Sequence, residues 1–455
     1  MRFKLFTLLL TIVSFTGFAQ NEDSLKIRAI ATEILLHGRA YENLHTLTKQ
    51  VGARLTGSPQ TYKAEAWGQK ALQQAGADHV ISQPCLVPHW IRGGKDEAWI
   101  ALPGKKNQPL DVLALGNSMG TGPKGIQAPV MLINSFEELE QQKAAVKGKI
   151  VFYNYKFNDT YVKTFEAYRD AVGYRGQGPS QAAKYGAVAV LIRSMTHAAD
   201  NNPHTGSTRY NDSFPKIPAA AMGLHDADKL AALLEKEPAT VFLKTNGKML
   251  PDTVAHNIIG EIIGSEFPEE VITVGGHLDS WDPAEGAHDD GSGCVQSIEV
   301  IRVLKAIGYK PRRTIRAVLF ANEENGLRGG IKYAEEARTK KEKHIFALES
   351  DEGGFTPRGF AVTMSQELLN KMRSWLPLLA PYGISEISQG GGGSDIGPLN
   401  RELGTPLAGL QPDSQRYFDI HHARSDVFES VNKRELELGA VSMAALIYLV
   451  DKYGL

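Results

Sequence analysis

The chain has 455 residues, of which 42% are hydrophobic and 22% are charged. A chain of this length exceeds what one compact core usually supports, so we expect two domains. The formal net charge is −1, from 50 basic and 51 acidic residues, and this balance gives no electrostatic reason to expect a nucleic-acid or membrane-surface partner.

The N-terminal residues are typical of an export signal. Met1 to Lys4 is positively charged, residues 5–18 are mostly apolar, and Gly17-Phe18-Ala19 resembles a cleavage site before Gln20. We therefore expect residues 1–19 to be a signal peptide and the protein to be periplasmic or secreted. The apolar run is short for a membrane anchor, and no later run approaches spanning length.

Export would permit a disulfide between Cys85 and Cys294, the two cysteines of the chain. However, Cys294 falls at the start of a predicted helix, where a small buried residue is expected. A chain this long also does not need a disulfide to fold. We expect two free thiols.

The first half of the mature chain changes character near residue 108. Before it, the pattern predicts helices over 23–50 and 60–76 and strands over 78–88 and 97–102. From 108 to about 250 there are short apolar β segments, and no paired acid or histidine spacing suggests catalysis there. The polar stretch 195–215 predicts a long exposed loop. We interpret residues 108–250 as an inserted accessory domain.

From Asn257 the pattern becomes an alternation of strands and helices, which is typical of a mostly parallel sheet with helices on both faces. We therefore expect an α/β domain with a mostly parallel mixed sheet, formed by residues 20–107 and 251–455. The predicted strands are 257–263, 271–275, 314–320, 344–349 and 404–410, and the predicted helices are 292–308, 327–339, 366–379 and 433–453.

The ends of these predicted strands carry metal-ligand chemistry. The strand at 271–275 leads into His277-Leu278-Asp279, and Asp289 follows in a turn of Asp and Gly. Strand ends deliver ligand residues to one edge of an α/β sheet, and imidazole and carboxylate suit zinc. Later strands end near further candidates: Glu323, Glu324, Asp351, His421 and His422.

Each candidate alone has a plainer interpretation. Adjacent glutamates favour a helix start, an aspartate before glycines is common in turns, and a lone histidine is more often structural. Together they offer two histidines and three carboxylates at successive strand ends, with one more glutamate beside them. That set predicts a two-metal hydrolase with a bridging carboxylate.

The same residues resemble the ordered motifs of the co-catalytic zinc exopeptidases, most closely the plasma glutamate carboxypeptidase, or carboxypeptidase Q, group. The resemblance covers essentially the whole mature chain, and residues 108–250 look like the protease-associated domain of that group. The motifs are Val51-Gly-Ala-Arg-Leu-Thr-Gly-Ser58, Pro88-His89-Trp90-x-Arg92-Gly93, His277-Leu-Asp-Ser-Trp-Asp282, Asp289-Asp290-Gly-Ser-Gly, Glu323-Glu324, Asp351, Gly393-Ser-Asp-Ile396 and His422-x-x-x-Asp426.

The resemblance implies two Zn²⁺ per subunit, a role for each motif residue, and a homodimer. Asp289 would bridge both metals, and Glu323 would be the general base. Asp279 would orient His277 through its free ring nitrogen. The peptide bond after Asp289 is cis in many relatives. The remaining ligands would be His277 and Asp351 on one metal, and Glu324 and His422 on the other.

One departure from the family leaves an alternative open. Many members have Tyr directly before the last histidine ligand, where this chain has His421. His421 is therefore a candidate for oxyanion or substrate contact, and either His421 or His422 can be the ligand. We choose His422 because Asp426 follows it at the family spacing.

The implied activity is hydrolysis of small peptides, particularly dipeptides with a free amino end. An aminopeptidase acting on longer peptides and a non-catalytic binding protein on the same scaffold are the alternatives. Arg416 and Arg424 are candidates for holding a substrate carboxylate, or are plain surface charges.

Overall fold

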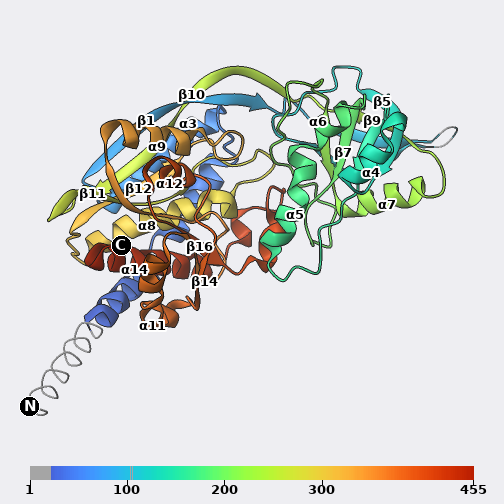
Figure 1. Cartoon of the computed structure of the whole chain (residues 1–455). Helices are drawn as coiled ribbons and strands as arrows, with labels where there is room; N and C mark the ends of the chain where they lie inside the picture. The colour runs from blue at the N-terminus through green and yellow to red at the C-terminus, as the bar shows by residue number, and fades with distance from the viewer. Residues whose placement is uncertain (1–21, 103, 105) are drawn as a thin grey trace, which may run out of the picture.

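The computed structural model describes residues 22–102, 104 and 106–455, and the chain forms two lobes, each built on its own sheet (Figure 1). The predicted signal peptide, residues 1–19, lies outside the described residues. Within the described part, no helix combines the length and the apolar character that a membrane span requires. The long strands β1 and β10 run side by side from the first lobe toward the second.

The first lobe contains a mixed sheet of eight strands whose centre is parallel. Strands β12, β11, β13 and β16 are parallel to one another, while β1, β10 and β14 join them by antiparallel pairing. The expected mixed α/β fold is therefore confirmed. In spatial order the strands are β1 (His79–Ile91), β10 (Lys248–Ile262), β12 (Arg313–Phe320), β11 (Phe267–His277), β13 (Lys343–Glu349), β16 (Leu407–Pro412), β14 (Pro357–Thr363) and β15 (Glu386–Gln389).

Helices cover both faces of this sheet, as the alternation of side chains along β12 shows. Ile315, Ala317 and Leu319 pack into the larger core with α3, α8 and α14. Val318 and Phe320 point to the other face and pack with α9 and α12. The helices are 22–37, α2 (Ala40–Thr46), α3 (Pro59–Ala75), α8 (Ser292–Ala306), α9 (Arg328–Lys340), α10 (Gln366–Arg373), α11 (Leu376–Leu379), α12 (Gly397–Leu403) and α14 (Lys433–Tyr453).

The second lobe also contains an eight-stranded mixed sheet, and helices not expected from the sequence accompany it. The boundary expected at residue 108 falls inside this sheet, because β2 already pairs with β9. The strands in spatial order are β3 (Gln108–Leu110), β2 (Glu97–Ala101), β9 (Thr240–Lys244), β5 (Ile126–Ile133), β6 (Ile150–Tyr153), β7 (Ala189–Arg193), β8 (Ala219–Met222) and β4 (Val112–Ala114). The helices are α4 (Phe136–Gln141), α5 (Thr164–Gly176), α6 (Gly178–Ala183) and α7 (Leu224–Leu234).

The start of α8 packs against the end of β11 without room for larger side chains. A β-carbon added at Gly276 would meet Asp290, and one at Gly293 would lie 1.9 Å from the carbonyl oxygen of Ser350. Cys294 follows directly and is buried, and like Cys85 it is a free thiol, as expected. Glycines at 276 and 293 therefore allow the turn that carries Asp289 to approach the strand end.

Arg54 binds the main chain of the loop between His277 and Asp289. Its side chain is fully buried, and it donates to the carbonyl oxygens of Leu278, Glu285 and Gly286 at 2.5, 2.6 and 2.9 Å. A buried carbonyl without a partner costs free energy, so one guanidinium satisfies three groups that water cannot reach.

Replacing Arg54 with Met is expected to destabilise the fold strongly. The change leaves three carbonyl oxygens unsatisfied, at about 3–5 kcal/mol in total. Urea unfolding of the variant measures this free energy. The matched control is Arg358→Met, because Arg358 is 57% exposed in its pair with Asp413, and such a pair contributes about 0–1 kcal/mol. Equal losses from both variants would contradict the role of Arg54.

Candidate metal centre

The residues singled out at strand ends meet at one edge of the first sheet. His277 ends β11, Glu324 follows β12, and Asp351 follows β13. Because the carboxyl ends of parallel strands meet at the same edge, the fold brings these three side chains together. Asp289 reaches them from the turn before α8, and His422 reaches them from the loop after α13 (Tyr417–Ile420).

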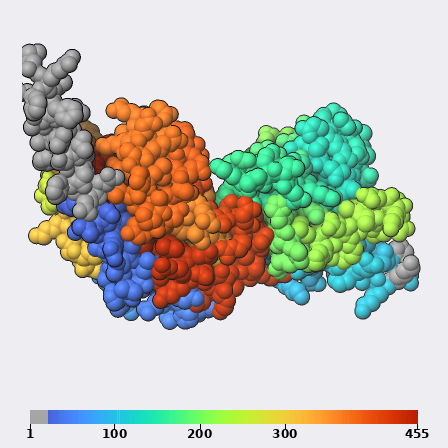
Figure 2. All heavy atoms as spheres, turned by 90° about the horizontal axis from the view of Figure 1, so that it is seen from below, coloured from blue at the N-terminus to red at the C-terminus, as the bar shows by residue number. Residues whose placement is uncertain are grey.

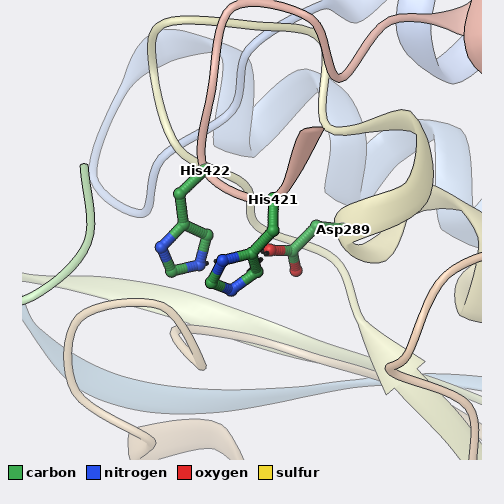
Figure 3. A group of neighbouring side chains, drawn as sticks. All are labelled: Asp289, His421 and His422. Carbon is green, nitrogen blue, oxygen red and sulfur yellow. Dashed lines mark ion pairs between the residues drawn. The ribbon is translucent and has the colours of Figure 1, made fainter. Parts of the chain in front are cut away.

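The side chains form two groups that share Asp289. Nε2 of His277 lies 3.1 Å from Oδ1 of Asp289 and 3.3 Å from Oδ1 of Asp351. Nε2 of His422 lies 3.2 Å from Oδ2 of Asp289 and 3.2 Å from Oε2 of Glu324. Figure 3 shows Asp289 directed at His422, with His421 alongside. Each oxygen of one carboxylate thus belongs to a different group.

The outer nitrogens of both histidines are occupied by main-chain carbonyls. Nδ1 of His277 lies 3.0 Å from the carbonyl oxygen of Asp279, and Nδ1 of His422 lies 3.2 Å from that of Thr205. In the neutral ring, Nδ1–H donates to the carbonyl and Nε2 keeps its lone pair. That lone pair then faces two carboxylate oxygens, an arrangement that a cation between them would stabilise.

The donor set fits zinc. Oδ2 of Asp289 and Oε1 of Glu324 are buried without a hydrogen-bond partner, which is costly unless another group binds them. The nitrogen–oxygen distances of 3.1–3.3 Å around Asp289 are close to the edge of a zinc tetrahedron, roughly 3.3–3.6 Å for metal–ligand bonds of about 2.0–2.2 Å. Imidazole and carboxylate are also common zinc ligands.

Two further aspartates near Asp289 accept hydrogen bonds from the main chain, so we do not assign them as metal ligands. Asp426 accepts from the main-chain N–H groups of His288 and Asp289 at 2.7 and 3.1 Å. Asp290 lies near His277 and Asp351, but its oxygens accept from the N–H groups of His277 and Gly293 at 3.0 and 2.9 Å. The peptide bond between Asp289 and Asp290 is cis, as the resemblance implied.

Asp279 contacts His277 differently from the expectation. The ring nitrogen donates to the main-chain carbonyl of Asp279, while the carboxylate Oδ1 lies 3.7 Å away, beyond hydrogen-bond range. The carboxylate instead accepts from the N–H of Glu323 at 3.0 Å and the hydroxyl of Thr56 at 2.9 Å. Asp279 therefore fixes the main chain at Glu323 as well as the ring of His277.

The structure distinguishes the two adjacent histidines. Nε2 of His422 lies 3.2 Å from Asp289, whereas Nε2 of His421 lies 3.8 Å from the same oxygen. His422 also contacts Glu324, and His421 stacks on His422 with ring centres 3.6 Å apart. The geometry favours His422 as the metal ligand and leaves His421 in the wall of the adjoining cavity.

Burial and mutual repulsion perturb the carboxylates of this cluster. Burial, together with nearby carboxylates, raises the pKa of Glu323 to about 8 and that of Glu324 to about 7. Burial alone would lower the pKa of His422, but the carboxylates of Glu324 and Asp289 raise it to about 10. All three pKa values are raised, which reflects an excess of negative charge in a buried site that divalent cations would neutralise.

A cavity of about 640 Å³ opens beside the cluster, in the range of roughly 300–1,000 Å³ typical of small-molecule sites. Figure 2 shows the hollow between the two lobes. The first lobe contributes Asp289, Glu323, Glu324, Asp351 and both histidines, and the second contributes a wall from α5 and the loops after β4 and β7. Among the lining residues of that wall are Asn117, Tyr168, Arg175, Ser207 and Arg209.

The expectation of a long exposed loop at 195–215 is wrong for its central part. His204 and Thr205 are buried. Nδ1 of His204 lies 2.7 Å from the carbonyl oxygen of His421. The main-chain N–H of Thr205 donates to the carbonyl oxygen of His422 at 3.0 Å. Ser207 donates to the carbonyl of Glu324 at 2.7 Å. The stretch is polar because its groups bond to residues of the first lobe, a partner that composition does not reveal.

Neither arginine suggested for substrate binding lines the cavity. Arg424 forms a bidentate pair with Asp111 at 2.7 and 3.0 Å, and Arg416 pairs with Glu435 at 2.8 Å. Two arginines of the cavity wall that the sequence did not indicate are Arg175 and Arg209 of the second lobe. Arg175 donates to the carbonyl of Thr205 at 3.3 Å, the same oxygen that His422 contacts.

Comparisons with known proteins agree with this fold. A model of peptidase family M28 matches residues 257–447. Carboxypeptidase Q of Mus musculus is 36% identical over 413 residues, which cover 90% of this chain and 85% of the relative. The Homo sapiens protein is 37% identical over the same shares.

Solved structures extend the match. A peptidase M28 precursor from Shewanella amazonensis has a TM-score of 0.90 at 31% identity and covers 95% of this chain and 97% of its own. The zinc aminopeptidase BSAP from Bacillus subtilis has a similar fold, with a TM-score of 0.64 at 21% identity over 90% and 94% of the two chains. The resemblance expected from the motifs is confirmed, and the chain belongs to peptidase family M28.

Proposed function

We propose that the protein is a di-zinc exopeptidase that hydrolyses small peptides, above all dipeptides with a free amino end. The proposal rests on the pairing of one oxygen of Asp289 with His277 and the other with His422. A cluster with a purely structural role does not require two histidine–carboxylate groups that share one carboxylate. A hydrolase with two metals requires this arrangement.

Asp289 would hold both metals. His277 and Asp351 would be the further ligands of one metal, and His422 and Glu324 those of the other. Zinc in such a centre supplies Lewis acidity, which activates a water molecule and polarises the scissile carbonyl. The carbonyls of Asp279 and Thr205 keep each histidine in the tautomer whose Nε2 is free to bind.

Glu323 acts as the general base. It takes a proton from the attacking water and passes it to the leaving amine. Its carboxylate lines the cavity, and its N–H is held by Asp279. Burial lowers the pKa of His421 well below its usual value. A neutral His421 in the cavity wall can donate a hydrogen bond to the substrate carbonyl oxygen.

The cavity supports a preference for short substrates. It lies between two lobes, so a wall on each side limits the length of the substrate. The free amino end follows from the resemblance to the carboxypeptidase Q group. The signal peptide, the homodimer and the identification of the second lobe as a protease-associated domain stay predictions.

A substrate panel tests this function. We expect the zinc-loaded enzyme to hydrolyse free dipeptides at least about 100-fold faster than their N-acetylated forms, because a site that hydrogen-bonds an amino group rejects an analogue that lacks it, and faster than tripeptides. Rates come from chromatography of the products, and elemental analysis counts the zinc. Faster cleavage of longer peptides would favour the aminopeptidase alternative. A protein with no zinc and no turnover would be a binding protein.

A further inference from the structure

The two walls of the cavity carry different charged side chains. The first lobe contributes four carboxylates, from Asp289, Glu323, Glu324 and Asp351. The second lobe contributes the cavity's two arginines, Arg175 and Arg209, and no carboxylate. Because three of the carboxylates are proposed metal ligands and Glu323 is the proposed base, the two arginines are the charged side chains of the cavity that the proposed mechanism does not use.

Arg175 is already committed to the protein. It is buried, donates to the carbonyl of Thr205 at 3.3 Å, and bonds to the hydroxyl of Tyr168. A β-carbon at Gly206 would lie 2.5 Å from its guanidinium, so the loop packs directly on it. Arg175 therefore fixes the loop around Thr205 and Gly206. A substrate has little access to the terminal nitrogens of Arg175.

Arg209 is available. Its side chain is exposed and lines the cavity, and its guanidinium forms no hydrogen bond or ion pair with any residue in the described part of the chain. The backbone around it is nevertheless fixed. Its N–H donates to the carbonyl of Gly176 at 2.8 Å, and Ser207, two positions earlier, bonds to the carbonyl of Glu324 at 2.7 Å.

We propose that Arg209 binds a carboxylate on the C-terminal residue of the peptide substrate. A planar guanidinium binds a carboxylate through two parallel hydrogen bonds. With the scissile carbonyl at the metal centre and the carboxylate on Arg209, the site fixes the distance between the cleaved bond and the C-terminus within one cavity of about 640 Å³, which favours substrates with a single residue after the cleaved bond. This inference rests on the proposed peptidase function.

The test compares a dipeptide with its C-terminal amide. We expect the wild-type enzyme to hydrolyse Ala-Leu with a kcat/KM about 10- to 100-fold above that for Ala-Leu amide. In Arg209→Met the preference falls to within about threefold, because kcat/KM for Ala-Leu drops while that for the amide stays. Arg209→Lys keeps the charge without the planar fork and should recover part of the preference. A comparison of kcat/KM for Ala-Glu amide and Ala-Gln amide tests in the same way whether Arg209 binds a side-chain carboxylate.

The control is Arg424→Met, whose arginine pairs with Asp111 outside the cavity and should leave the preference unchanged. An Arg209-dependent preference in either peptide pair supports the proposal and identifies which carboxylate is bound. A wild-type preference retained in Arg209→Met, or equal losses on acid and amide, overturns it.

Binding gives a readout that does not need turnover. In the Glu323→Gln background, calorimetry should show Ala-Leu binding at least about 10-fold more tightly than its amide, and adding Arg209→Met should abolish the difference. Equal binding of both peptides without Arg209→Met overturns the inference. Hydrolysis of neither peptide by the wild-type enzyme would instead contradict the proposed function, so the two failures are distinguishable.

Discussion

Replacing Asp289 with Ala is expected to remove most of the bound zinc and nearly all activity. One oxygen of this carboxylate lies 3.1 Å from His277 and the other 3.2 Å from His422, so a single substitution removes a ligand from both metal positions. We expect at most one zinc per chain, against two in the wild type, and a fall in kcat/KM on the order of 10⁴-fold. Elemental analysis after gel filtration and initial rates with a dipeptide measure the two effects.

A matched substitution separates this effect from a general loss of charge. Asp252 is exposed and lies outside the cavity, so Asp252→Ala should keep two zinc ions and wild-type activity. Circular dichroism checks that Asp289→Ala remains folded, as its loop is still held by Arg54 and Asp426. Two zinc ions in the folded Asp289→Ala variant would rule out the bridging role.

The first lobe's part of the site follows from local pattern. Apolar β-branched runs predict the buried strands, and the polar residues just after each run then fall at one edge of a parallel sheet. His277, Glu324 and Asp351 lie near one another for this reason. The choice of His422 over His421 needed a family spacing, because adjacent residues in a loop can turn either way.

The second lobe's part did not follow from pattern. Arg175 and Thr205 reach His422 from more than 200 positions earlier in the chain, and no spacing rule links such distant residues. The strand β8 is three alanines and a methionine, a composition that does not favour strands. It forms because β7 and β4 flank it in the sheet. Tertiary context decided both points.

The sequence predicted that Asp279 contacts His277, but it could not predict which group of Asp279 makes the contact. The motif indicated a partner for His277, and the main-chain carbonyl fills that place at 3.0 Å. The carboxylate is left free to accept from Glu323 at 3.0 Å. A sequence motif specifies which residues are close, but main chain and side chain can exchange partners within it.

Replacing Glu323 with Gln should separate chemistry from metal binding. The Glu323 carboxylate contacts neither histidine within ion-pair distance, unlike that of Glu324, which lies 3.2 Å from His422. An amide of the same shape cannot accept the proton of the attacking water. We therefore expect two zinc ions per chain and a kcat lowered by about 10²–10⁴-fold. Stopped-assay rates and elemental analysis on the same sample give both quantities.

The neighbouring residue provides the control. Glu324→Gln changes the same functional group one position away, but at a proposed ligand, so it should lower the zinc content as well as the rate. The two variants thus differ in zinc content although both lose activity. Because Asp279 holds the main chain at Glu323 and not its side chain, the glutamine can occupy the position of the glutamate. Wild-type activity in Glu323→Gln, or zinc loss equal to that of Glu324→Gln, would exclude Glu323 as the general base.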